Sequence, residues 1–103
     1  MRYRLDKNFK AHVKLDKWDT WSADSTMAQM IYPLLVAFRL NIGGYPCAFD
    51  SIEEWGAVVD KMVNAFEILA DRDNLILMRS DDEQRVVDEG LALFAEYFEG
   101  LWN

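Results

Sequence analysis

Apolar and polar residues alternate near the start of the chain. Tyr3 and Leu5 follow charged neighbours, and apolar residues then recur at every second position from Phe9 to Leu15. This period of two is typical of a strand with one buried face. Asp6-Lys7-Asn8, between the two runs, is rich in turn-forming residues. The pattern predicts a short N-terminal β-hairpin or strand, so that residues 1–17 form a basic extended arm or β-ribbon.

Three later segments carry apolar residues at the spacing of amphipathic helices. The predicted helices span residues 24–41, 51–70 and 80–102. Their expected buried stripes are, in chain order, Met27, Ile31, Leu34, Leu35 and Phe38; then Trp55, Val58, Val59, Met62, Phe66 and Leu69; and then Val86, Gly90, Leu93, Phe94, Tyr97, Leu101 and Trp102. Gly90 within the third stripe suggests that another helix crosses closely there. We therefore expect a mainly α fold: a compact three-helix domain with a short N-terminal β-hairpin or strand, in which residues 1–103 form a single domain.

Local signals set the expected helix boundaries. Asp24 is the predicted N-cap of the first helix, because aspartate accepts hydrogen bonds from free amides of the first turn. Ser51 and Ser80 each precede a glutamate by three positions, which is the capping-box pattern. Pro33 lies inside the first helix and predicts a kink or a break there. The apolar run Leu75–Met78 is compatible with a helical turn or a short strand, and periodicity does not decide between them.

The net charge of −7 is unevenly distributed. Residues 1–17 hold six basic and two acidic residues, whereas residues 18–103 hold five basic and sixteen acidic residues. An acidic body repels a phosphate backbone, which argues against general nucleic-acid binding. No apolar run approaches membrane-spanning length, and the single cysteine, Cys47, excludes an intramolecular disulfide. The basic arm is expected to contact an anion, the protein's own acidic surface or a neighbouring molecule.

The most unusual stretch of the sequence is Trp18–Asp24, which contains two tryptophans and two aspartates. In a functional interpretation, the indole rings of Trp18 and Trp21 stack on a ligand or partner while Asp19 or Asp24 accepts hydrogen bonds. In a structural interpretation, Asp24 caps the helix and the tryptophans seal its end. If the ligand is anionic, the expected cationic groups are Lys14, Lys17 and Arg39.

The candidate enzymatic sites are incomplete in the sequence. Acidic residues on the helices mostly lie opposite the apolar stripes, and the paired spacing of a metal-dependent nucleotide hydrolase is missing. Cys47 has no histidine near it in the sequence, and His12 lies on the predicted ribbon. The Gly43-Gly44 pair follows a helix, whereas a phosphate loop follows a strand. We expect no catalytic residues, metal or cofactor, and a non-enzymatic role is favoured.

Residues 12–103 resemble a family of small uncharacterised tailed-bacteriophage proteins. The resemblance rests on Val13–Ala28, with its Trp-Asp-Thr-Trp block, and on later blocks within Glu54–Glu67 and Gly90–Trp102. Members of that family have a short strand leading into Trp-Asp-Thr-Trp and an Asp-x-Thr-Leu-Ala helix. This chain departs from the pattern at Met27, where leucine is usual, and in a shorter loop between the first two helices. The resemblance implies a phage origin and no particular mechanism.

Three functional hypotheses follow from these observations. The first is a non-enzymatic phage binding protein in the host cytoplasm, a host-defence antagonist that sequesters a small nucleotide signal or binds a host protein. The second is a homo-oligomeric structural or assembly module without a ligand. The third is a metal-dependent nucleotide hydrolase. The sequence leaves open the ligand, the host target and the oligomeric state.

Overall fold

The computed structural model describes residues 2–5, 7–8, 11–71 and 79–102. Its elements are β1 (Arg2–Leu5), β2 (Ala11–Lys14), α1 (Lys17–Trp21), α2 (Ala23–Leu40), α3 (Ile52–Ala70), α4 (Asp81–Tyr97) and a short 3-10 helix, η2 (Phe98–Gly100). The predicted mainly α class is confirmed. The predicted apolar run at 75–78 lies outside the described residues.

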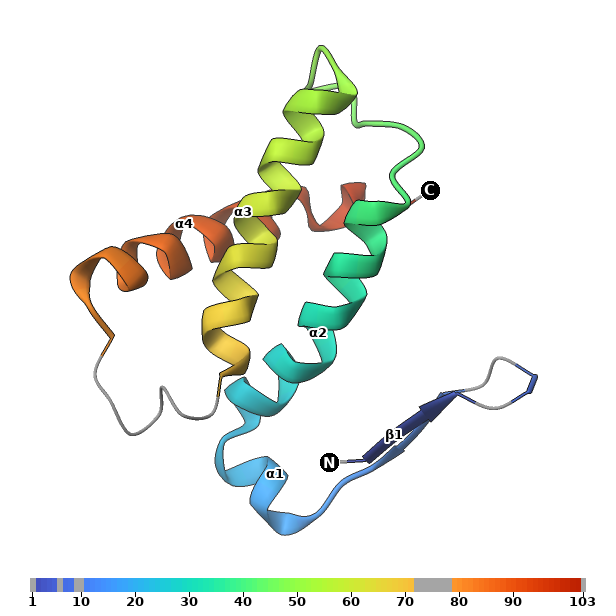
Figure 1. The fold of residues 1–103 in the computed structure, drawn as a ribbon, viewed down its shortest axis with the longest axis vertical. Coiled ribbons are helices and arrows are strands. Elements are labelled where there is room, and N and C mark those ends of the chain that lie inside the picture. Colours follow the sequence, from blue (N-terminus) through green and yellow to red (C-terminus); the bar gives the residue numbers. More distant parts are fainter. Residues whose placement is uncertain (1, 6, 9–10, 72–78, 103) are drawn as a thin grey trace.

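The three long helices form a pair, α2 and α3, with α4 lying across it (Figure 1). Helices α2 and α3 run antiparallel side by side, and α4 crosses α3 (Figure 1). The molecule measures 44 × 43 × 18 Å, with a radius of gyration of 15.0 Å, against about 13 Å for a compact domain of this size. The expected compact shape is therefore wrong, because α4 lies across only part of the α2–α3 pair and the N-terminal arm extends outside the helices (Figure 1).

The N-terminal arm consists of two paired strands. β1 and β2 are antiparallel, in a register that runs from Arg2 opposite Lys14 to Leu5 opposite Ala11. The described residues of the two strands extend away from the long helices, and β2 leads into α1, which contacts α2 (Figure 1). The two strands therefore project away from the helices (Figure 1).

The core lies between α2, α3 and α4. The buried cluster includes Ala28 and Leu35 of α2 and four residues of α3, which are Trp55, Val59, Met62 and Phe66. The stripe predicted for residues 51–70 is confirmed, since these four residues are buried and Val58 and Leu69 pack against them. Phe49 and Tyr97 add aromatic contacts to Trp55, with ring centroids 5.2 and 6.0 Å away.

The stripe predicted for residues 80–102 is confirmed at most of its positions, since Gly90 is buried and Leu93, Phe94, Tyr97 and Leu101 pack against the core, but it is wrong at Val86 and Trp102. Val87 is buried, whereas Val86 is 37% exposed and Trp102 is 75% exposed. The predicted close crossing at Gly90 is confirmed, because an added Cβ there would overlap Ala65 Cβ and lie 2.7 Å from the Lys61 carbonyl oxygen. That contact selects the face of α4 that turns inward. The helix ends at Tyr97, so the prediction that it continues to residue 102 is wrong.

The caps differ from one helix to the next. Ser80 and Glu83 form the complete predicted capping box, while Ser51 Oγ accepts from the Glu54 amide and the Glu54 carboxylate accepts from the Asp50 amide. The prediction that Asp24 is the N-cap of α2 is wrong, because Ser22 holds that position and Asp24 lies inside the first turn. Helix α2 continues through Pro33, so there is no break at that residue.

Candidate functional site

The Trp18–Asp24 stretch begins with a short helix, α1, that was not predicted. The Asp16 amide donates to Asp19 Oδ2 at 2.9 Å, and the Asp19 amide donates to Asp16 Oδ1 at 3.2 Å. Asp19 is 3% exposed, and its carbonyl accepts from Thr26 Oγ1 at 2.9 Å. This reciprocal bonding resembles a capping box, so the contacts of Asp19 start α1 and tie it to α2. The Asp-x-x-Asp spacing was the signal for this helix in the sequence.

The other candidates near α1 are more accessible. Trp21 is 73% exposed, and Lys14, Lys17 and Asp24 are also exposed. Trp18 is part of α1, but its side chain is not among those that the structure describes. This end of the molecule therefore presents an exposed indole beside exposed charges of both signs.

Arg39 lies at the opposite end of α2. Its Nε donates to Asp60 Oδ1 at 2.8 Å, and its guanidinium carbon lies 2.9 Å from the position that a Cβ on Gly56 would occupy. About sixteen residues separate it from Ala23, which is roughly 24 Å along a helix. The structure therefore does not bring Arg39 together with Trp21, Lys14 and Lys17, and its contacts join α2 to α3.

The described part of the chain contains no group of three His, Cys, Asp or Glu side chains that could hold a metal ion. Cys47 is exposed, and the His12 side chain is not described. Burial raises the pKa of the Tyr97 phenol above its ordinary value, and the Glu96 carboxylate adds to that shift. The Tyr97 ring belongs to the aromatic cluster with Phe49 and Trp55. Among the described helices, none has the length and apolar character needed to cross a membrane.

A pocket of about 320 Å³ opens near the C-terminal end of the described chain. It is lined by Gly43, Gly44, Tyr45, Pro46, Gly100 and Trp102. None of these residues is charged, so the pocket lacks the convergent polar side chains that usually orient a small ligand. It also lies at the end of α2 away from Trp21.

An accessible feature that the sequence prediction missed is the outer face of α2. This name covers seven exposed residues: Ala23, Met27, Met30, Pro33, Leu34, Ala37 and Leu40. Met27 is 55%, Leu34 is 69% and Leu40 is 79% exposed. The prediction that Met27 and Leu34 belong to the buried stripe is therefore wrong. The signal was present in the sequence, since Asp24 and Arg39 are the only charged residues among the eighteen of α2.

The buried side of the same helix explains the error. Ala28, Ile31, Leu35 and Phe38 pack in or against the core, and they already form a full stripe at helical spacing. Apolar residues on the remaining side are consequently left facing solvent. Contiguous exposed apolar surface of this kind usually marks an interaction site.

Comparisons with protein-family models, with curated proteins and with solved structures found no match to this chain.

Proposed function

We propose that this chain is a non-enzymatic protein-binding module that recognises a helical partner surface through the outer face of α2. The observation that carries the proposal is that this uncharged face stays exposed, with Leu34 at 69%, beside a core that buries the other side of the helix. Apolar side chains at spacings of three and four residues suit helix-to-helix contact. Trp21, the last residue of α1, is also exposed and lies two residues before the start of α2.

The proposed biological setting is a phage infection. The resemblance to tailed-phage proteins supports a phage product acting in the host cytoplasm, with a host protein or another copy of the chain as its partner. Antagonism of a host defence is one role for such a module. The capture of a small nucleotide has less support, since phosphate recognition needs convergent cations and Arg39 is paired with Asp60, far along α2 from Lys14 and Lys17.

Site-specific photo-crosslinking tests the protein-binding function. A photoreactive phenylalanine analogue replaces Leu34 on the outer face, and the matched control replaces Leu91, which is 40% exposed on α4. In cells that express each variant, illumination should produce a defined protein adduct from position 34 and much less from position 91. The absence of any adduct from position 34, or equal labelling from both positions, would contradict the proposal.

A further inference from the structure

We infer that the partner on the outer face of α2 is a second copy of this chain, with the two α2 helices packed antiparallel. This inference rests on the proposed function and specifies its partner. Three properties of the described residues support it: the spacing of the outer face, its lack of charge, and the position of opposite charges at the two ends of the molecule.

The spacing of the outer face is self-complementary. Its central stripe is Ala23, Met27, Met30, Leu34 and Ala37, with intervals of four, three, four and three residues. This alternation is the seam of helices that pack side by side. When the stripe meets an inverted copy centred on residue 32, Met30 lies against Leu34 and Met27 lies against Ala37. Each layer then pairs two medium side chains or a large one with a small one, which allows close packing.

Charge explains why two copies would meet on this face. Each chain carries a net charge of −7, so most contacts between copies bring acidic groups together. The outer face contains no charged side chain. Two copies that meet there bury apolar surface without placing like charges opposite each other.

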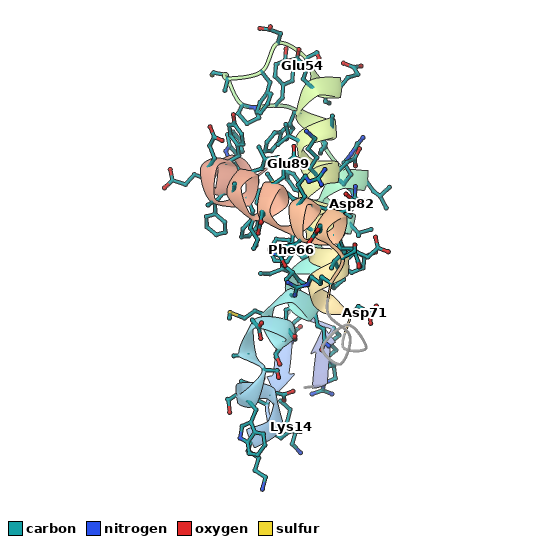
Figure 2. The ribbon with its side chains drawn as sticks, turned by 90° about the vertical axis from the view of Figure 1, so that its left-hand side faces the viewer. Lys14, Glu54, Phe66, Asp71, Asp82 and Glu89 are labelled. Atoms are coloured by element: carbon teal, nitrogen blue, oxygen red, sulfur yellow. The ribbon has the colours of Figure 1, made fainter. Side chains whose placement is uncertain are left out.

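The ends of the molecule favour the antiparallel arrangement. Lys14 and Glu54 lie at opposite ends of one chain (Figure 2). Among the described residues, four basic side chains are exposed on the arm and α1, against two acidic ones at the same end (Arg4, Lys7, Lys14 and Lys17 against Asp16 and Asp24). At the other end of α2, around the start of α3, Asp50, Glu53 and Glu54 are exposed. In an antiparallel pair, the basic end of each copy lies beside the acidic end of the other. A parallel pair would instead place both basic ends together and both acidic ends together.

The arm and Trp21 supply area that the stripe lacks. Residues 27–40 of a helix cover a face roughly 20 Å long and 10 Å wide, which is less than the roughly 800 Å² per partner of a typical stable interface. Trp21, at 73% exposed, and the β1–β2 arm precede α2 in the chain and would add contact area where they pack on the second copy. A two-stranded hairpin has marginal stability in water, and packing against a neighbour would support it.

The mass of the purified chain in solution gives the first test. Light scattering should show twice the 12.0 kDa chain mass. Leu34→Glu should raise the dissociation constant at least tenfold, because it places two carboxylates in the seam. The control Leu91→Glu adds the same charge on α4 and should leave the dimer intact. Circular dichroism checks that both variants remain helical.

Disulfide trapping tests the orientation. In a Cys47→Ser background, one tagged chain carries Met27→Cys and an untagged chain carries Ala37→Cys. An antiparallel pair centred on residue 32 should cross-link only when the two chains are mixed, because cysteines at identical positions would be roughly 15 Å apart along the helices, beyond the reach of a disulfide. A disulfide between two copies of the same variant would indicate a parallel pair and overturn the inference.

The outcomes separate this inference from the proposed function. If light scattering shows a monomer and no disulfide forms between the Met27→Cys and Ala37→Cys chains, the inference that the partner is a second copy is overturned. The protein-binding function then stands if the photoreactive group at position 34 still captures a different protein in cells. Both fail if position 34 captures no protein.

Discussion

Leu34 and Leu35 are consecutive residues of α2 with different surroundings. Leu35 is 4% exposed and packs in the core with Trp55 and Val59, while Leu34 is 69% exposed on the outer face. The two faces have similar apolar character, but α3 covers only one of them. Apolar periodicity therefore identifies both faces as able to bury surface, and the presence of a partner decides which one does so.

Truncation of the two leucines to alanine should give the largest difference in stability between the two faces of α2. Leu35→Ala is expected to lower the free energy of unfolding by about 2–5 kcal/mol, because it removes buried contacts and leaves a cavity. Leu34→Ala should change it by no more than about 0.5 kcal/mol at concentrations where the chain is a monomer. Urea unfolding followed by circular dichroism measures both values. Equal losses would mean that the outer face is already covered within a single chain.

The contact between α3 and α4 gives a second covered region for comparison. Gly90→Ala should destabilise the fold by about 1–3 kcal/mol through overpacking against Ala65 and the Lys61 carbonyl, although alanine is the better helix former. The control Gly43→Ala adds a Cβ with no heavy atom within 4 Å and should be close to neutral. Thermal and urea unfolding measure the effect. Partial recovery in the double variant Gly90→Ala with Ala65→Gly would assign the loss to the helix crossing, and a neutral Gly90→Ala would show that the helices can separate there.

The first turn of α2 is tied to α1 by the hydrogen bond of Thr26, and loss of this bond should have a smaller effect on stability. Thr26→Val removes the donor to the buried Asp19 carbonyl and should cost about 0.5–1.5 kcal/mol. Thr20→Val is the matched control, since its hydroxyl donates to the Lys17 carbonyl at an exposed position, and it should cost less. If the two variants lose equal stability in urea unfolding, α1 is not held on α2 by the Thr26 bond.

Helix α3 was predictable because its apolar residues occupy one side only. Trp55, Val59 and Met62 alternate with charged residues at helical spacing, so just one orientation buries them. The Ser80–Glu83 box was equally predictable, since all of its bonds are made within four consecutive residues. Local sequence rules are enough to predict the buried face of a helix where any other orientation would bury charged side chains.

The candidate site was harder to predict because its residues depend on neighbours in space. Aspartate is a favoured N-cap residue, which is why Asp24 was predicted to be the N-cap. Because α1 ends at Trp21, α2 begins one residue before Asp24, and Ser22 is its N-cap. Arg39 was a plausible phosphate ligand until α3 placed Asp60 within 2.8 Å of it. In both cases the contact that assigns the residue its position or its partner comes from another segment of the chain.

The sequence by itself determined the helical class, the approximate helix boundaries and the separation of a basic arm from an acidic body, because these depend on local periodicity, caps and residue counts. Only the tertiary structure decided which apolar side of α2 faces the core and which of Val86 and Val87 turns inward. The physical reason is that burial requires a second surface. The sequence specifies the residues that are able to pack, and the arrangement of the other helices decides which of them do.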